Sequence, residues 1–196
     1  AEAIAIEWEP LPPVIGGEAA LATDASKVWP DRRDNLAYAL ELGEAKPTQA
    51  AFAKAAHVVE LTIVNQRLVT NYLDTRGVIA TYDGKDDLTT LTLGSQGSHA
   101  VRDIIAGHVL RIKPERMRVI TPDVGGGFGT KLFPYREYAL AAVAARKLGE
   151  PVVWIADRTE HFLGDSQGRD NITTARLALD AHHKFLALDI ETIADM

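Results

Sequence analysis

Four glycines and one phenylalanine make up the segment best suited to chemistry, Gly125, Gly126, Gly127, Phe128 and Gly129. Glycines at this density cost backbone entropy, so the chain must need positive φ angles or a close backbone approach there. The segment lies between an expected strand and an expected helix, where backbone N–H groups can point at an anion or a cofactor oxygen. Phe128 indicates a loop that has one specific pocket for its ring. The alternative is a tight strand-to-helix turn without chemistry.

This glycine loop does not match the two common nucleotide-binding patterns. A Walker-type phosphate loop beginning at Gly125 would need glycine at position 130, where the chain has Thr130. The dinucleotide pattern G-x-G-x-x-G fails because Thr130 and Leu132 stand where its last glycine belongs. An unrelated phosphate or nucleotide binder is therefore only a distant alternative.

Gln96 is the second candidate, within residues 94–99 (GSQGSH). It stands at an expected junction between a strand and a helix, where Ser98 could cap the helix. A side-chain amide at such a place can donate to a ligand oxygen and accept from a ligand N–H or O–H. A local loop-capping role is the alternative for Gln96.

The remaining residues that could bind metals or act as nucleophiles form no pattern. His57, His108 and His161 have no partner at metal-ligand spacing, and His182 and His183 fall in an expected surface turn. The chain has no cysteine, which excludes disulfides, thiolate nucleophiles and cysteine-ligated iron–sulfur clusters. No metal ligand is therefore predicted on this chain.

Composition indicates an ordinary globular protein of one large or two small domains. The 196 residues are 46% hydrophobic and 24% charged, with a net charge of −6. This charge and the dispersed arginines argue against nucleic-acid binding. No apolar stretch is long enough to span a bilayer, and residues 1–4 lack the features of a signal peptide.

Hydrophobic periodicity predicts an α+β protein whose strands and helices frame the two candidate segments. Residues 16–49 read as a long connection with a helical turn near residues 18–21. Expected helices cover residues 98–110 and 134–148, the second ending at Gly149. Expected strands cover residues 4–8, 57–64, 77–83, 88–93, 118–122, 152–157 (buried), 170–180 and 184–191. Both ends of the chain look like cuts through a larger structure.

Taken together, these motifs resemble the molybdenum-binding subunit of the xanthine oxidase family. The resemblance rests on residues 94–102 (GSQGSHAVR) and 118–131 (RVITPDVGGGFGTK). Residues 6–14 (IEWEPLPPV), 151–160 (PVVWIADRTE) and 168–170 (GRD) support it in the same order. The nearest likeness is to the large subunits of carbon monoxide and aldehyde dehydrogenases, and it covers nearly the whole chain.

The resemblance implies a molybdenum–molybdopterin cofactor, often in its cytosine dinucleotide form, and hydroxylation of a substrate carbon with oxygen from water. Gln96 matches the glutamine that hydrogen-bonds an oxo ligand of molybdenum. Phe128 and Gly129 match the loop that lies against the metal ligands through its backbone, and Gly125, Gly126 and Gly127 shape that loop. The resemblance assigns neither a catalytic side chain nor a metal ligand to this chain.

The resemblance also implies an organisation and a set of partners. Residues 1–15 would end an N-terminal hammerhead-like α/β domain, 16–56 would form an extended connection, and 57–196 would begin the molybdopterin-binding domain, with a mixed sheet and packed helices. The chain would be a fragment, inactive alone, since no position matches the family's general-base glutamate. It would join the rest of its subunit, an Fe-S subunit and an FAD subunit in a cytoplasmic hetero-oligomer, with the periplasm as an open alternative. Neither Fe-S clusters nor FAD are expected on this chain.

Two departures from the family's pattern bear on specificity. Some purine-hydroxylating members carry glutamate directly after the lysine of the loop, whereas Leu132 follows Lys131 here, which disfavours a purine substrate. Members commonly have Glu-Pro where this chain has Asp74 and Thr75. These differences leave a non-catalytic scaffold or assembly piece of the same family as the alternative function.

Overall fold

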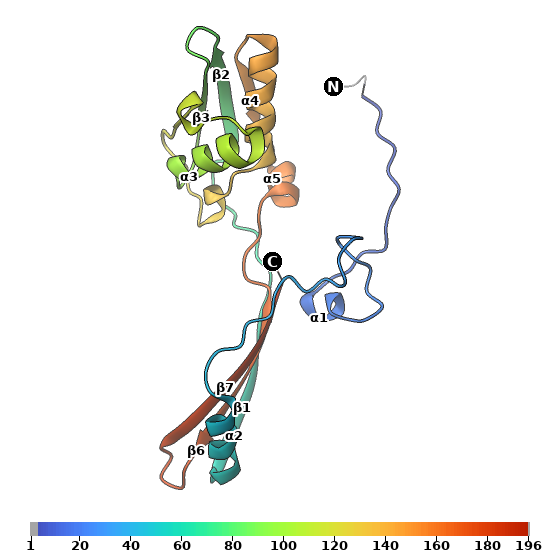
Figure 1. The fold of residues 1–196 in the computed structure, drawn as a ribbon, viewed down its shortest axis with the longest axis vertical. Helices are drawn as coiled ribbons and strands as arrows, with labels where there is room; N and C mark the ends of the chain where they lie inside the picture. The colour runs from blue at the N-terminus through green and yellow to red at the C-terminus, as the bar shows by residue number, and fades with distance from the viewer. Residues whose placement is uncertain (1–3, 196) are drawn as a thin grey trace. The chain divides into compact units, whose positions relative to one another are not determined.

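The computed structural model describes residues 4–195, and these form two compact units. One, here the split unit, combines residues 4–67 with residues 169–195, and the other, the central unit, is Leu68–Gly168. Each unit contains one β-sheet and at least one helix (Figure 1). The expected α+β class is therefore confirmed. The domain boundaries at residues 15 and 56 stay a prediction.

The split unit is built on an antiparallel three-stranded sheet. β6 (Asn171–Leu179) lies between β1 (His57–Asn65) and β7 (Phe185–Ala194), and the order is β1-β6-β7. α1 (Gly17–Ala20) and α2 (Ala45–Lys54) both contact β7. α2 is also held by the guanidinium of Arg176, which lies 4.8 Å from the centre of the Phe52 ring.

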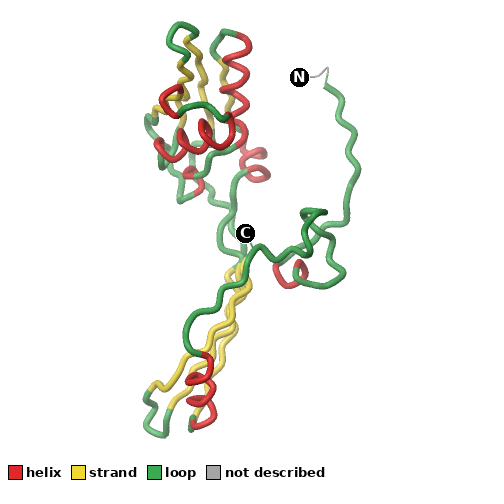
Figure 2. The backbone as a smooth tube through the Cα atoms, viewed as in Figure 1, coloured by secondary structure: helices red, strands yellow, loops and turns green. Residues whose placement is uncertain are grey.

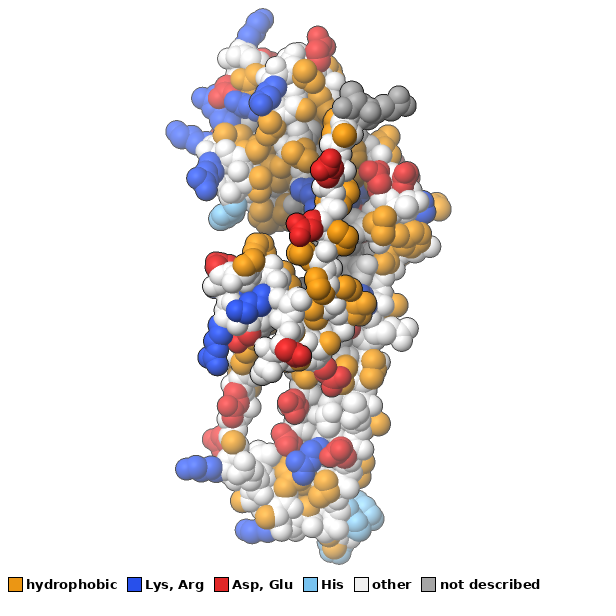
Figure 3. Space-filling view, turned by 90° about the vertical axis from the view of Figure 1, so that its right-hand side faces the viewer, with side chains coloured by type: hydrophobic (Ala, Val, Ile, Leu, Met, Phe, Trp, Pro, Cys, Tyr) orange, Lys and Arg blue, Asp and Glu red, His pale blue; other side chains and the backbone are white. Residues whose placement is uncertain are grey.

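Apolar side chains of this sheet stay at the surface of the described chain. Every residue of β1 is exposed, although the strand has the β-branched residues that favour sheet formation. Figure 3 shows hydrophobic side chains at the molecular surface among charged ones. The exposed apolar residues of β1 are Val58, Val59, Leu61, Ile63 and Val64.

The central unit contains a four-stranded mixed sheet in the order β4-β3-β2-β5 (Figure 2). β2 (Gly77–Asp83) and β3 (Leu88–Leu93) form a hairpin, and β5 (Val152–Ile155) pairs antiparallel with β2. β4 (Met117–Ile120) pairs parallel with β3. The mixed sheet with packed helices agrees with the expected fold.

Helices cover one face of this mixed sheet. α4 (Arg136–Leu148) packs on β2, β3 and β5, and α3 (Ser98–Asp103) continues into the π-helical η1 (Ile104–Leu110) beside it. Alternate residues of β3 are buried, as expected for a strand with one covered face. The buried core residues are Val78, Ala80, Leu91, Leu93, Val101, Ile105, Ala106, Met117, Tyr135, Tyr138, Ala139, Ala141, Ala142 and Ala145.

Most expected elements are confirmed, and three expectations are wrong. Residues 4–8 form no strand, since this exposed stretch has no partner strand among residues 4–195 and leads into prolines. The stretch expected as an extended connection contains α2, whose alanine-rich sequence favours a helix. β5 is not a buried strand: it lies at the sheet edge, with Val153 and Ile155 exposed.

Short helical segments complete the central unit. η2 (Pro114–Arg116) leads into β4, and η3 (Thr130–Leu132) follows the glycine loop. α5 (Arg158–Gly164) begins with a capping box in which Asp157 and Glu160 each accept from the other's backbone N–H. Within residues 4–195, no helix combines the length and the apolar character that crossing a bilayer requires.

Candidate functional site

The glycine loop of residues 125–129 connects the segment after β4 to η3. Gly125, Gly126 and Gly129 have φ angles of 66°, 87° and 95°, which side chains rarely tolerate. A Cβ at Gly125 would overlap the side chain of Asp74, whose backbone N–H donates to the Gly125 carbonyl at 3.2 Å. Glycine is therefore required at position 125 both by conformation and by a close neighbour.

Gln96 contacts the same loop from the turn between β3 and α3. Its Oε1 accepts the backbone N–H of Gly129 at 2.9 Å. A Cβ at Gly127 would lie 2.5 Å from this Oε1, so only glycine leaves room for the amide. The backbone N–H of Gln96 donates to the carbonyl of Lys131 at 3.1 Å. The structure thus brings together the two segments selected from the sequence, 33 residues apart at their hydrogen bond.

The expected side-chain cap at Ser98 and the expected pocket for Phe128 are both absent from the described residues. α3 begins without a side-chain cap; instead the Ser95 hydroxyl accepts the N–H of Gly97 at 3.0 Å. Phe128 is 75% exposed and has a φ angle of 49°, a left-handed conformation that is unfavourable for a bulky residue. The loop presents this ring outward instead of burying it against residues 4–195.

Lys131, directly after the glycine loop, is buried beneath it. Its Nζ donates to the carbonyl of Val124 at 2.5 Å and lies 4.4 Å from the centre of the Tyr72 ring. Burial lowers the pKa of the Lys131 ammonium, and the nearby carboxylates of Asp74 and Asp165 oppose this shift. Next to Lys131, the Thr130 hydroxyl donates to the Gly127 carbonyl at 2.7 Å, which fastens the loop from inside.

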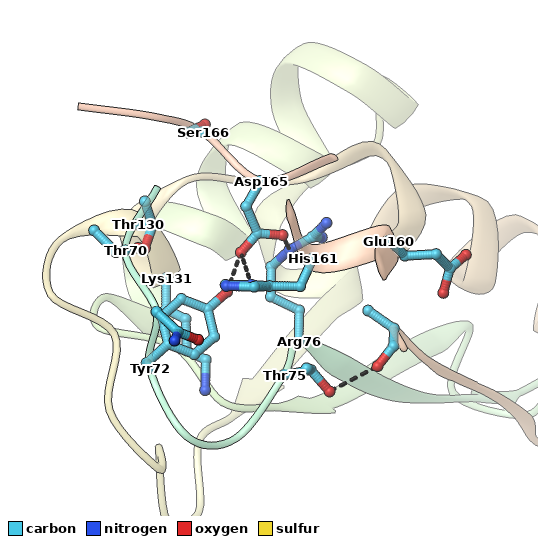
Figure 4. Close-up of polar contacts among 12 residues, drawn as sticks. Thr70, Tyr72, Thr75, Arg76, Thr130, Lys131, Glu160, His161, Asp165 and Ser166 are labelled. Atoms are coloured by element: carbon cyan, nitrogen blue, oxygen red, sulfur yellow. Dashed lines mark hydrogen bonds and ion pairs between the residues drawn. The ribbon is translucent and has the colours of Figure 1, made fainter. Parts of the chain in front are cut away.

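Buried polar side chains, Tyr72 among them, surround the carboxylate of Asp165 (Figure 4). The carboxylate of Asp165 accepts from Arg76 Nε at 2.6 Å and from the Tyr72 hydroxyl, and contacts His161 Nδ1 at 2.9 Å. Arg76 also pairs with Glu137, at 3.1 Å. Four of these five side chains are almost completely buried, the exception being Glu137. We call Tyr72, Arg76, Glu137, His161 and Asp165 the Asp165 cluster.

Aromatic rings surround the guanidinium of Arg76. Its Cζ lies 3.6 Å from the centre of the Tyr135 ring and 5.2 Å from that of Trp154. Burial raises the pKa of Tyr138 to about 12, although the nearby Arg76 opposes this effect. Burial, followed by its hydrogen bond to Asp165, also raises the pKa of Tyr72. These groups form a buried, charged layer between α4, α5 and the segment before β2.

The sequence patterns do not predict the Asp165 cluster, although the spacing of two of its residues indicates part of it. His161 and Asp165 are four residues apart on and just after a helix, a spacing that brings side chains together. This pair does not match the metal-ligand pattern of two histidines at this spacing, so the metal-ligand patterns of the sequence do not indicate it. Tyr72 and Arg76 carry no local pattern, because their partners are more than 60 residues away.

No group of three or more histidine, aspartate or glutamate side chains able to hold a metal ion occurs within residues 4–195. The histidines of the expected surface turn, His182 and His183, are exposed as predicted. The ring of His183 stacks on that of His57, with their centres 5.1 Å apart. The polar groups where Gln96 meets the glycine loop are amides: the Gln96 side chain and the backbone of the loop.

Comparison with known proteins agrees with this geometry. Residues 28–196 match the family described as the molybdopterin cofactor-binding domain. The chain is 33% identical to the carbon monoxide dehydrogenase large chain of Hydrogenophaga pseudoflava over 207 residues, covering 99% of this chain and 26% of that protein. It is 34% identical to 6-hydroxypseudooxynicotine dehydrogenase complex subunit gamma of Paenarthrobacter nicotinovorans, covering 97% of this chain and 23% of that protein.

Solved structures lead to the same family. CO dehydrogenase from Oligotropha carboxidovorans superposes with a TM-score of 0.91 at 30% identity, over 99% of this chain and 26% of that one. Quinoline 2-oxidoreductase from Pseudomonas putida 86 has a TM-score of 0.83 at 33% identity, over 96% and 24%. The chain thus spans about a quarter of the relatives it matches. With its glycine loop and Gln96 in contact, the chain belongs to the molybdopterin cofactor-binding domain family, among the molybdenum-binding subunits of xanthine oxidase relatives.

Proposed function

We propose that this chain forms one wall of the molybdopterin site in the catalytic subunit of a molybdenum hydroxylase. The observation that carries the proposal is the orientation of Gln96. Its Oε1 is occupied by the N–H of Gly129, so its Nε2 group must face elsewhere. Nε2 has no hydrogen-bond acceptor among residues 4–195, and the side chain is exposed. Two amide N–H groups are thus free to donate to an oxygen of the cofactor.

The residues present fit such a group. A metal–oxo centre carries its own charge, so neutral donors and a close backbone suit it better than ionised side chains. Gln96, the backbone of Phe128 and Gly129, and the bends at Gly125, Gly126 and Gly127 provide these features. When bound, the molybdenum cofactor supplies the redox chemistry of hydroxylation with oxygen from water. The residues of this chain position and hydrogen-bond the cofactor; none is proposed to transfer a proton.

The substrate class we propose is an aldehyde, carbon monoxide or an N-heterocycle, and not a purine. The relatives include enzymes named for carbon monoxide, aldehydes and quinoline, which supports this range. Leu132 supports the exclusion of purines, because it places a partly exposed apolar side chain beside Gly97 near Gln96. Electrons would pass to Fe-S and FAD subunits of a hetero-oligomer, and the cofactor would be the cytosine dinucleotide form.

The first test is the molybdenum content of the protein purified from its native host with its accompanying chains. We expect close to one molybdenum per chain by elemental mass spectrometry, together with the fluorescence of oxidised pterin. An intact complex without molybdenum would reject the proposal and favour the scaffold function. Nucleotide release on denaturation would show whether the pterin carries cytosine.

Replacing Gln96 by alanine should lower the oxidation rate about tenfold, because one hydrogen bond to a charged centre contributes roughly 1.5 kcal/mol. Steady-state dye reduction with aldehydes, carbon monoxide and N-heterocycles would measure the effect. The matched control is Gln49→Ala, an exposed glutamine in α2 of the split unit, which should leave the rate unchanged. An unchanged rate and molybdenum content in Gln96→Ala would refute the role of this amide.

A further inference from the structure

Lys131 differs from every other lysine of the described chain in being buried, with 2% of its surface exposed. No carboxylate lies within 4 Å of its Nζ among residues 4–195, so the ammonium has no ion-pair partner there. Burial of a charge that has no ion-pair partner is costly even with the carboxylates of Asp74 and Asp165 nearby, and a packed apolar side chain would avoid that cost. Its location therefore calls for an explanation other than stability.

The contacts of Lys131 link the two parts of the candidate site. Its ammonium holds the carbonyl of Val124, the residue before Gly125, at 2.5 Å. Its own carbonyl accepts the backbone N–H of Gln96 at 3.1 Å. One residue is thus bonded both to the entrance of the glycine loop and to the backbone of the glutamine that this loop contacts.

Tyr72 provides the surface on which the ammonium rests. The Lys131 Nζ lies 4.4 Å from the centre of the Tyr72 ring, in cation–π contact. A Cβ at Gly126 would lie 3.1 Å from the Tyr72 Cβ, so the glycine loop also sits close against this residue. The same tyrosine therefore supports the lysine and one bend of the loop.

Asp165 holds the hydroxyl end of the Tyr72 side chain by a hydrogen bond. The Tyr72 hydroxyl donates to Asp165, which Arg76 and His161 hold at 2.6 Å and 2.9 Å (Figure 4). A hydroxyl that donates to a carboxylate leaves its ring richer in electrons, which strengthens the attraction of the ring for a cation. The contacts form a continuous series from Asp165 through Tyr72 and Lys131 to Val124.

We infer that Lys131 is a positioning residue for the cofactor-binding loop, and that Tyr72, held in place by the other members of the Asp165 cluster, orients its ammonium. The lysine holds the glycine loop and Gln96 in one arrangement by bonding to both. The inference rests on the proposed function, because holding the loop in one arrangement affects activity only if the loop binds the cofactor. We call these two hydrogen bonds of Lys131, to Val124 and to Gln96, the Lys131 clamp. The clamp does not depend on which ligand the loop binds.

The test replaces Lys131 by methionine in the complete protein and follows hydrogen exchange of the loop amides. Methionine fills a similar volume without charge, so thermal stability should stay unchanged or rise. Exchange of the Gly129 amide should nevertheless become about tenfold faster, while amides within α4 should keep their rates. If Lys131 only stabilised the fold, Lys131→Met would instead lower the thermal stability and speed amide exchange in both the loop and α4.

Two further variants complete the test. Tyr72→Phe keeps the ring but loses the hydroxyl bond to Asp165, and should speed Gly129 exchange about threefold; it also carries the test if Lys131→Met does not fold. Lys147→Met, at an exposed lysine of α4, should have no effect on the loop. Unchanged Gly129 exchange in both Lys131→Met and Tyr72→Phe would overturn the inference.

The exchange data and the molybdenum content separate the two proposals. Faster loop exchange in a protein that lacks molybdenum would support the clamp and reject the proposed function. Parent-like exchange in Lys131→Met and Tyr72→Phe, in a protein that holds molybdenum, would reject the clamp alone. Faster exchange with full molybdenum content in the parent would support both.

Discussion

Replacing Asp165 by asparagine is expected to lower the free energy of unfolding of the central unit by about 3 kcal/mol. Asparagine keeps the shape of the side chain but removes the charge that compensates Arg76, whose side chain is 1% exposed. Removing one partner of a buried pair leaves an uncompensated charge, and this costs more than the pair itself contributes. The estimate lies at the low end of the usual range because Glu137 still pairs with Arg76, at 3.1 Å.

Tryptophan fluorescence during urea unfolding can measure this loss. Trp154 packs against the core of the central unit and lies near Arg76, whereas Trp8 and Trp29 are already exposed and should change little. The control is Asp103→Asn, which removes a surface pair with Arg102 and should change stability by less than about 0.5 kcal/mol. Equal losses in the two variants would contradict a stabilising role for the Asp165 cluster.

The elements that sequence analysis located correctly are those with local signals. The helix of residues 136–148 follows from its alanines and from Gly149, which ends it with a φ angle of 68°. The hairpin of β2 and β3 follows from alternation around an Asp-Gly turn. These features depend on neighbours within a few residues, so a single sequence contains them in full.

The errors concern properties that depend on distant partners. Residues 4–8 have the composition of a strand, but a strand also needs a neighbouring strand, and none lies beside them within residues 4–195. The sequence predicts a buried strand over residues 152–157, yet the order of the sheet places β5 at an edge. Position within a sheet arises from topology, which local composition does not encode.

The candidate site also contains some residues with local sequence signals and others whose partners are distant in the sequence. The glycines and Gln96 stand out because their residue types are unusual for their positions, and the structure brings them within hydrogen-bond distance. The Asp165 cluster draws on Tyr72, Arg76 and Glu137, each ordinary in its own segment. The residues proposed to contact the cofactor are therefore easier to predict from the sequence than the residues that support them.

Replacing Gly127 by alanine is expected to lower the oxidation rate about a hundredfold while costing little stability. The new Cβ would lie 2.5 Å from Gln96 Oε1, so the amide must move away and release the N–H of Gly129. Loss of the amide accounts for about tenfold, as in Gln96→Ala, and the displaced side chain left beside the cofactor site accounts for the rest, since a misplacement of about 1 Å can cost about a hundredfold in rate. Because the obstructed atom ends a flexible side chain, the free energy of unfolding should fall by less than about 1 kcal/mol.

The double variant Gly127→Ala with Gln96→Ala decides whether displacement of the amide is the cause. Shortening Gln96 removes the collision, so the double variant should oxidise substrate about tenfold faster than Gly127→Ala alone, at the rate of Gln96→Ala. Gly107→Ala is the control for adding a methyl group, since nothing lies within 4 Å of a Cβ there. If the double variant is slower than either single variant, Gly127 acts independently of Gln96, and the amide is not the group that the loop positions.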